Sequence, residues 1–383
     1  AHHGHAGAMM QAREKGDELF VGVHNDTDIL VNKGPPVMTL AERMVAVEGC
    51  RWCTTAVANA PYVTDPLVMD EYGCKYVVHG DDITTDKDGK DCYAEVKAKG
   101  RFIVVKRTPN ISTTDLVGRM LVHTTEHHLA RVDGQQWAQW QRVSAADAAQ
   151  AGGKTLLTPE NVERYRRYAT AADARSAGAA VWVYTEAGVH ELVKGQASAG
   201  TKPVYYVDGG FDLFNPGHIT FLKRVRELAD ADGSLVVVGV ADDAAVNSAR
   251  GGSYPVMNLL ERSLCVLQSK SIDGLVLGAP RAVDTPFLTL FKRGTGLSVH
   301  RVVHGPTTPL QADDYDDARA TGLLLEVTTG LDLYASMTVE SIVERVVANR
   351  AAFEERQRRK GVKAETEKSL ENQEEAVRAG AAA

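Results

Sequence analysis

Features that are scarce in this chain of 383 residues exclude several classes of protein. No apolar run approaches the roughly 20 residues that a membrane-spanning helix needs, so we expect at most peripheral membrane association. Basic residues are not in excess, because the formal net charge is −7, and this argues against a nucleic-acid partner. Cysteine is rare, and the five present form no disulfide framework, which favours a reducing compartment.

Two of the cysteines, Cys50 and Cys53, have CxxC spacing. A structural zinc site would need a second pair of ligands, and no such pair occurs. We therefore prefer ordinary cysteines at a helix end to a redox or metal motif, and we predict no resident metal. Apolar residues make up 44% of the chain and charged residues 24%, the balance of a globular protein long enough for two domains.

Several short motifs recur in the same order about 210 to 220 residues apart, which predicts two copies of one domain. The apolar run from Leu19 to Val23 has its counterpart in the run from Leu235 to Val240. The other shared features are Pro36-Val37-Met38 with Glu42-Arg43, which recur as Pro255-Val256-Met257 with Glu261-Arg262, and Gly4-His5, which recurs as Gly217-His218.

Each copy alternates short apolar runs with helical patterns, which indicates an α/β fold with parallel sheets covered on both faces. In the first copy we expect helices at 5–16 and 40–47 and strands at 19–23 and 76–78. In the second copy we expect strands at 204–207, 235–240 and 275–277 and helices at 218–231 and 258–267. The predicted organisation is two tandem doubly wound domains at 1–124 and 203–340, a linker with a helical segment at 125–202, and a charged helical tail at 341–383.

The sequence His2-His3-Gly4-His5 is the first motif that carries chemistry. Residues three apart share a helix face, so the imidazoles of His2 and His5 can point at one ligand, and Gly4 lets backbone approach closely. A helix start also offers unpaired N–H groups, which suit phosphate. A tag or a chance match is the alternative.

The second motif is Arg107-Thr108-Pro109-Asn110-Ile111-Ser112-Thr113-Thr114. Arg107 offers a bidentate fork for phosphate, and the hydroxyl residues stand at a predicted helix start. An ordinary capped helix would explain Ser112 but not the Arg-Thr sequence that precedes it.

The two motifs, in this order and about a hundred residues apart, resemble the cytidylyltransferase family with its HxGH and RTxxxST signatures. The tandem layout and the exact variants resemble its ethanolamine-phosphate branch. Further matches are Lys33-Gly34-Pro35-Pro36-Val37, Glu42-Arg43, Ala60-Pro61-Tyr62, Val78-His79-Gly80-Asp81-Asp82-Ile83-Thr84 and Asp91-Cys92-Tyr93. The resemblance implies Rossmann-like nucleotidyltransferase domains that join CTP and phosphoethanolamine to form CDP-ethanolamine and pyrophosphate, for phosphatidylethanolamine synthesis.

The resemblance also implies roles for the residues that face CTP. His2 and His5 would hold CTP phosphates and the charge developing at the α-phosphorus. Lys33 would bridge the α-phosphate and the incoming phosphate, although a loop lysine is the alternative. The rest of the CTP site would be Gly4, His79, Asp81, Asp82, Arg107, Thr108, Ser112, Thr113 and Thr114. Mg²⁺ would arrive with CTP.

On the acceptor side, Tyr62 and Tyr93 would line the ammonium pocket, where an aromatic face attracts a cation. Half-buried core tyrosines are the alternative. Asp81 or Asp82 would read the cytidine or face the amine. Arg43 would have a phosphate or structural role. The family further implies a cytoplasmic protein, peripheral at most to the endoplasmic reticulum, and leaves a homodimer open.

The chain departs from the family pattern in both copies. The first copy starts at Ala1 and should lack the strand and Gly-x-Phe-Asp turn that the second copy keeps, so we expect it to gain stability and activity when that segment is supplied. The second copy is predicted to be degenerate, with Asp212, Asn215, Gly217 and His218 at its site. In this alignment of the copies, Val302 to Thr308 falls opposite the Arg107 motif, and Leu277 to Pro280 falls opposite His79 to Asp82.

Other readings of the chain remain open at this point. The nearest is a cytidylyltransferase for phosphocholine or another alcohol phosphate, because the shape of the pocket around the tyrosines decides that choice. The Arg107 motif argues against adenylyl-forming HxGH enzymes, and an aminoacyl-tRNA synthetase would want a Lys-rich second motif, a longer chain and a tRNA-binding surface. A non-catalytic nucleotide-binding scaffold is the alternative from a different class, and the joint presence of His2, His5, Lys33 and Arg107 argues against it.

Overall fold

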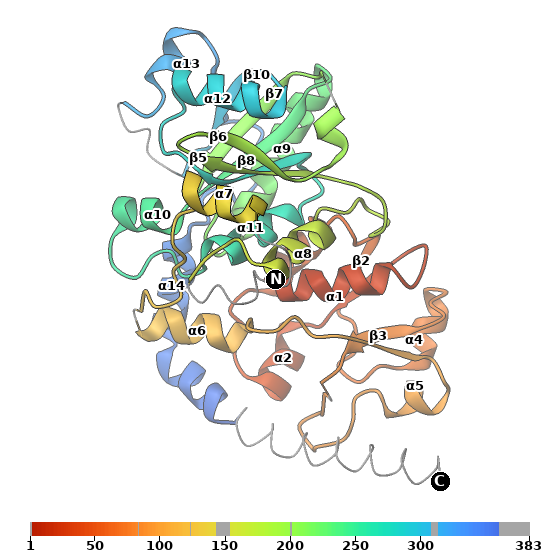
Figure 1. Cartoon of the computed structure of the whole chain (residues 1–383). Coiled ribbons are helices and arrows are strands. Elements are labelled where there is room, and N and C mark those ends of the chain that lie inside the picture. The colour runs from red at the N-terminus through yellow and green to blue at the C-terminus, as the bar shows by residue number, and fades with distance from the viewer. Residues whose placement is uncertain are drawn as a thin grey trace.

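Two copies of one α/β arrangement follow each other along the chain and lie on either side of the middle of the molecule (Figure 1). The structure, a computed structural model, describes residues 2–82, 84–122, 124–142, 154–199, 201–307 and 313–359. Among these residues, none of the helices combines the length and the apolar character needed to span a bilayer.

The first copy runs from helix α1 to helix α6. Its elements are α1 (His3–Arg13), β1 (Phe20–Val23), α2 (Asp26–Lys33), α3 (Leu40–Glu48), β2 (Thr55–Ala58), α4 (Pro66–Glu71), β3 (Val77–Gly80), α5 (Ala94–Ala98), β4 (Phe102–Val105) and α6 (Thr113–Val122). The four elements predicted here are confirmed as α1, β1, α3 and β3, with small shifts at their ends.

The segment between the copies is more structured than the sequence suggested. It holds α7 (Gly134–Arg142), α8 (Pro159–Tyr168), β5 (Ala180–Thr185), β6 (Gly188–Val193) and a 3₁₀ turn (Gln196–Ala199). The helix predicted after Thr158 is confirmed as α8, and the Thr158 side chain accepts a bond from Asn161 N. The hairpin of β5 and β6 corrects the interpretation of 125–202 as a linker, because both strands belong to the sheet of the second copy.

The second copy starts at β7 and ends at α14. Its elements are β7 (Val204–Gly209), α9 (Pro216–Ala231), β8 (Leu235–Ala241), α10 (Asp243–Arg250), α11 (Leu259–Leu267), β9 (Gly274–Ala279), α12 (Thr285–Thr295), β10 (Val299–His304), α13 (Asp316–Ala320), β11 (Leu324–Glu326) and α14 (Val339–Ala348). All five elements predicted here are present. Residues 350–359 are also helical, and the rest of the predicted charged tail lies outside the described residues.

The second copy forms a seven-stranded sheet in the order β11-β10-β7-β8-β9-β5-β6, parallel except for β6. Successive side chains along its strands point alternately into two hydrophobic cores. Val236, Val238 and Val240 pack in the larger core, whereas Val237 packs in the smaller one with Phe287 and Phe291 of α12. Side chains of opposite parity point to opposite faces of a sheet. Burial on both faces explains the continuous Val-rich run of β8 and confirms the doubly wound fold.

The first copy arranges its described strands in two separate pairs. Strand β1 pairs with β2, and β3 pairs with β4, all in parallel. The corresponding pairs of the second copy are β8 with β9 and β10 with β11, and β7 lies between them. Among the described residues the first copy has no strand in the place of β7.

This strand order corrects two of the sequence pairings. Val302 to Gly305 runs along the end of β10, the counterpart of β3, and therefore matches Val77 to Gly80 rather than the Arg107 motif. Leu277 to Pro280 ends β9 and matches Ala58 to Pro61. Asn59 and Gly278, at equivalent points, both have positive φ (58° and 68°). The true counterpart of the Arg107 motif is the loop 327–338 between β11 and α14, which also contains no arginine.

The two copies pack through reciprocal contacts. Arg51 N donates to Gln268 O (2.8 Å) and Lys270 N donates to Gly49 O (3.1 Å), on either side of a bridge between Cys50 and Ser269. The molecule is therefore a pseudo-dimer within one chain, with these residues close to its pseudo-twofold axis. Burial at this bridge raises the pKa of the Cys50 thiol to about 12, which fits an ordinary packed cysteine rather than a reactive one.

Two equivalent ion pairs also join the copies in a reciprocal way. Arg119 on α6 pairs with Glu261 on α11 (2.7 Å), and Arg345 on α14 pairs with Glu42 on α3 (2.8 Å). The two carboxylates stand at equivalent positions, and each also closes the capping box of its own helix. Helices α6 and α14 lie side by side between the copies (Figure 1).

Candidate active site

The start of α1 holds two imidazoles in a fixed arrangement. His2 is the N-cap, and its Nδ1 accepts from Gly4 N (3.1 Å), while His5 Nδ1 accepts from His2 N (3.3 Å). The ring centroids are 4.0 Å apart. Because both Nδ1 atoms accept, the neutral rings carry their protons on Nε2, so both Nε2 atoms are donors. The HxGH sequence thus builds a pair of side-chain donors beside the free N–H groups of the helix start.

Both rings are neutral at pH 7. Desolvation by the surrounding protein lowers the pKa of His2 and His5, and the nearby Arg107 lowers both further. His2 is half-buried and His5 keeps an exposed surface, so a ligand can reach them. Burial is the main cause of both pKa shifts, and the cations that add to the shifts also favour an anionic ligand.

Gly4 is required by close packing at this point. A Cβ on Gly4 would lie 2.9 Å from the His2 ring and 2.9 Å from Cγ2 of Ile111. Ile111 belongs to the Arg107 motif, so the glycine lets the second motif close onto the first. The close packing seen at Gly4 involves protein side chains, and its predicted role in approaching CTP stays a prediction.

The Arg107 motif connects β4 to α6. Arg107 N donates to Asp81 Oδ1 (3.1 Å), and its guanidinium pairs with Asp82 (3.3 Å), with both side chains about half exposed (48% and 47%). The carboxylates predicted to face cytidine or amine therefore hold Arg107 in this structure. Ser112 Oγ accepts from Asp115 N (3.0 Å) and caps α6.

Three threonines complete this side of the site. The Thr108 hydroxyl bonds the side chain of Tyr168 and packs close to Gly7, which ties the motif to α1. Thr113 and Thr114 form the first turn of α6, the helix start predicted for phosphate. The Thr114 carbonyl accepts from the side chain of Gln357 (3.3 Å).

Lys33 and Tyr62 meet on the acceptor side of the site. Lys33 is the last residue of α2, before Gly34 with its positive φ of 86°, and its Nζ lies 5.7 Å from the Tyr62 ring centroid. Tyr62 is buried just after β2. His79 of β3 lies beside Tyr93, with ring centroids 4.7 Å apart and the rings tilted by 37°. Each predicted tyrosine thus lies beside a basic side chain of the site.

Sequence reasoning missed two contributors. His24 follows β1 directly, and its ring centroid is 5.0 Å from that of Tyr62. Its position at the carboxyl end of a parallel strand was the available signal. Arg356, in the helical residues after α14, donates to Pro35 O (2.7 Å) and so supports the loop that follows Lys33. The distance along the chain concealed that contact.

Arg43 has a structural role. Its guanidinium donates to His24 O (2.8 Å) and Met38 O (3.2 Å) and pairs with Asp26. In the second copy Arg262 makes the equivalent bonds to Ala241 O, Met257 O and Asp243 while fully buried. These arginines tie the loop after a strand to the following helix in both copies.

The second copy keeps the backbone of the site but changes its chemistry. Asn215 caps α9, and its side chain accepts from Gly217 N (2.9 Å), while His218 Nδ1 accepts from Asn215 N (3.3 Å). His218 stacks against Phe214 with parallel rings. Asp212 is buried and accepts from Val256 N (2.7 Å) and Met257 N (2.9 Å), so its role is structural.

A carboxylate of the chain itself occupies this second site. Arg250 is the counterpart of Lys33, and it pairs with Glu340 in the first turn of α14, the position that corresponds to Thr114. A Cβ on Gly217 would lie 2.8 Å from Tyr334 O and 2.9 Å from Met337 O, so carbonyl oxygens crowd the helix start. Acceptor groups at this position repel a phosphate, which accords with the predicted degeneracy.

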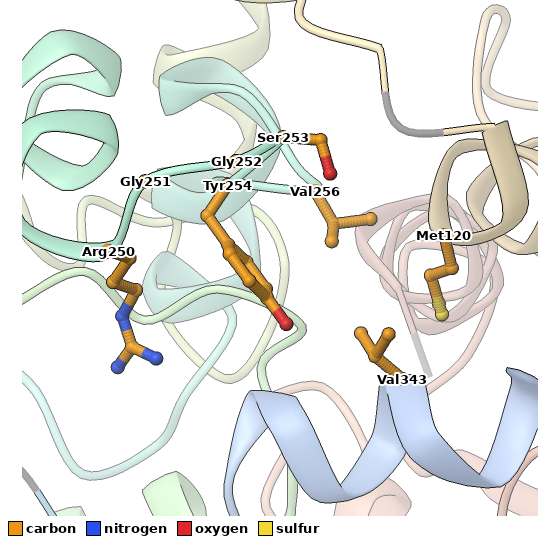
Figure 2. Close-up of a pocket in the computed structure, with 8 residues that line it drawn as sticks. All are labelled: Met120, Arg250, Gly251, Gly252, Ser253, Tyr254, Val256 and Val343. Atoms are coloured by element: carbon orange, nitrogen blue, oxygen red, sulfur yellow. The ribbon is translucent and has the colours of Figure 1, made fainter.

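A small cavity of about 140 Å³ lies between the copies and not at the first site. Figure 2 shows Tyr254 with its hydroxyl towards Val343 of α14, Met120 of α6 opposite, and Arg250 on the far side. None of the predicted CTP or substrate residues lines this cavity. It lies beside Arg250 of the second copy, and we give it no role in catalysis.

The fold and the histidine pair define a nucleotidyltransferase. Comparison with known proteins gives the family: residues 1–119 and 206–350 match the family model described as "Cytidylyltransferase-like". This chain therefore belongs to the cytidylyltransferase-like family, as its motifs predicted.

Similar proteins are ethanolamine-phosphate cytidylyltransferases. Those of Mus musculus and Dictyostelium discoideum are 35% and 37% identical over 94% of this chain, covering 87% and 92% of their own lengths. A probable choline-phosphate cytidylyltransferase of Schizosaccharomyces pombe is 36% identical, but over 31% of this chain and 34% of its own length. Similarity across both copies is thus found with the ethanolamine-phosphate branch.

Proposed function

We propose that this protein joins CTP and phosphoethanolamine to form CDP-ethanolamine and pyrophosphate, a step of phosphatidylethanolamine synthesis, and that the first copy carries the reaction. The observation that carries the proposal is the pair of Nε2–H donors on His2 and His5, surrounded by Lys33 and Arg107. The match to ethanolamine-phosphate relatives over both copies supports the choice of substrate.

The chemistry follows from the charges. A phosphate oxygen of phosphoethanolamine attacks the α-phosphorus of CTP in line, and the bond from that phosphorus to the bridging oxygen of pyrophosphate breaks. Reactants and leaving group are all anionic, so positioning and charge neutralisation are the main tasks. His2 and His5 donate hydrogen bonds to the α-phosphate as its charge grows, and no covalent intermediate is required.

The other basic residues of the site bind different phosphates of the two substrates. Lys33 leaves the Tyr62 ring to neutralise the attacking phosphate and the α-phosphate. Arg107 releases Asp82 and binds the β- and γ-phosphates. Backbone N–H groups at the start of α6 bind the same phosphates. Mg²⁺ enters as the Mg–CTP complex, as a substrate rather than a resident cofactor. His79 and Asp81 border the same space.

The test is a direct assay of the reaction. The protein is incubated with Mg²⁺, either CTP or ATP, and either phosphoethanolamine or phosphocholine, and the activated alcohol is quantified. CDP-ethanolamine as the main product supports the proposal. A preference for phosphocholine keeps the chemistry but overturns the substrate, an ATP product overturns the nucleotide, and no product from folded protein favours a nucleotide-binding scaffold.

Location and assembly complete the proposal. We place the enzyme in the cytoplasm, at most peripherally on the endoplasmic reticulum, as the family implies. A homodimer remains a prediction. The faces of α3 and α11 already pack against the opposite copy within the chain, so a second chain would have to use another surface.

A further inference from the structure

The histidines around the first site fall into two groups by what the backbone does to their Nδ1 atoms. At His2 and His5 a backbone N–H donates to Nδ1. At His24 the partner of Nδ1 is the carbonyl oxygen of Ala60 (3.0 Å). A carbonyl only accepts, so His24 Nδ1 carries the proton and Nε2 of the neutral ring is a bare acceptor.

The neutral state of His24 follows from its surroundings. Burial lowers its pKa below the ordinary value for histidine, and the Lys33 ammonium lowers it further, while the Ala60 bond opposes the shift. Among the residues that the structure describes, no group hydrogen-bonds His24 Nε2. This acceptor is therefore available to a ligand.

A primary ammonium fits beside His24. The Tyr62 ring, whose centroid is 5.0 Å from that of His24, already has the Lys33 ammonium 5.7 Å from it. The face of Tyr62 therefore attracts a cation within reach of His24. A lysine stem has several rotatable bonds, and a move of the Lys33 ammonium to the phosphates would leave this place to the substrate ammonium.

We propose that His24 is a specificity-determining residue that accepts an N–H of the phosphoethanolamine ammonium at Nε2 while Tyr62 faces the same cation. The proposal rests on the function proposed above and deepens it. Both –NH₃⁺ and –N(CH₃)₃⁺ are attracted by an aromatic face, but only –NH₃⁺ has hydrogens to donate. An acceptor fixed by the backbone thus separates two substrates that cation–π attraction treats alike.

The test compares wild type with His24→Phe, which keeps a ring beside Tyr62 and removes the acceptor. The substrates are phosphoethanolamine, its N-methyl and N,N-dimethyl derivatives, and phosphocholine. We expect the kcat/KM ratio of phosphoethanolamine to phosphocholine to fall roughly 10- to 100-fold, the worth of a hydrogen bond to a charged group. The loss should lie in the KM for phosphoethanolamine, with the KM for CTP unchanged.

Two controls keep the outcome interpretable. His300→Phe makes the same exchange at an exposed histidine of the second copy and should leave the ratio unchanged. The tautomer is read directly from ¹⁵N chemical shifts of labelled histidine at pH 8, where His24 should be protonated on Nδ1 and His2 and His5 on Nε2.

The results separate the two proposals. If wild type prefers phosphocholine or forms no product, the proposed function fails. If wild type prefers phosphoethanolamine and the folded His24→Phe enzyme keeps the same ratio, the proposal for His24 alone is overturned. An Nε2-protonated His24 would overturn it as well.

Discussion

The two copies solve the same local problem at the start of α1 and of α9 with different side chains. His2 and Asn215 both cap the helix, and His5 and His218 both return a bond to the cap. Helix capping needs an acceptor, which either residue supplies. Donation to a phosphate needs the Nε2–H of an imidazole, which Asn215 lacks. The comparison separates what the fold requires from what the reaction requires.

The basic position after the next strand teaches the same lesson. Lys33 in the first copy lies over Tyr62, whereas Arg250 in the second is paired with Glu340. Glu340 supplies within the chain the negative charge that a substrate would otherwise bring. The arginine of the second copy is thus neutralised within the chain.

The largest expected difference between the copies is in turnover. His5→Ala removes one Nε2–H donor and should lower kcat/KM for CTP at least about a hundredfold, whereas His218→Ala should change it by less than about twofold. Formation of CDP-ethanolamine measures both, and melting temperatures show that both variants fold. Equal losses would mean that the second copy is also catalytic.

Substitution of Gly4 and of Gly217 should affect different properties of the protein. The methyl group of Gly4→Ala would press on the His2 ring and Ile111, so kcat/KM should fall by roughly 10-fold as the ring moves. Gly217→Ala would press on the Tyr334 and Met337 carbonyls and should lower the melting temperature more than the turnover. Steady-state kinetics and thermal unfolding of both variants check this, and a purely thermal effect of Gly4→Ala would refute it.

The reciprocal ion pairs should be unequal in stability. Arg119 and Glu261 are largely buried (13% and 7% exposed), whereas Arg345 is 42% exposed beside the buried Glu42. Arg119→Ala should therefore destabilise by about 3 kcal/mol and Arg345→Ala by about 1 kcal/mol. Thermal unfolding of the two variants at equal salt measures the order, and the reverse order would show that exposure does not decide.

The smallest expected effect concerns Asp208 on β7. Among the described residues, this strand has no counterpart in the first copy. Burial raises the pKa of Asp208 to about 7, although its carboxylate accepts from the Tyr315 hydroxyl (2.7 Å). Because the folded pKa exceeds the unfolded one of 3.8, the stability that Asp208 contributes is present below about pH 4 and is lost as the pH rises through about 7. Asp208→Asn should thus gain in melting temperature over wild type between pH 5.5 and 8, and a constant difference would contradict the shift.

Local patterns in the sequence predicted most of the fold. Val-rich runs such as 235–240 and capped helices such as the one after Thr158 can be predicted, because the sequence pattern that indicates them lies within a few residues. The HxGH and Arg107 motifs were likewise found, and the structure brings them together at Gly4 and Ile111.

The predictions that failed concern features that depend on contacts between residues far apart in the chain. The hairpin of β5 and β6 carried a strand pattern in Ala180 to Thr185, but its membership of the second sheet depends on pairing with β9. The counterpart of the Arg107 motif was misplaced because the loop 327–338 has the same position between strand and helix but contains no arginine. His24 was missed because only its tertiary contact with Tyr62 distinguishes it.

The bridge between Cys50 and Ser269 has a further consequence for how the halves stay together. In a dimer of separate chains, the fraction assembled depends on protein concentration. Here the contact surfaces belong to one polypeptide, so their encounter is unimolecular and dilution does not separate them. The melting temperature of this interface should accordingly be the same at nanomolar and micromolar protein.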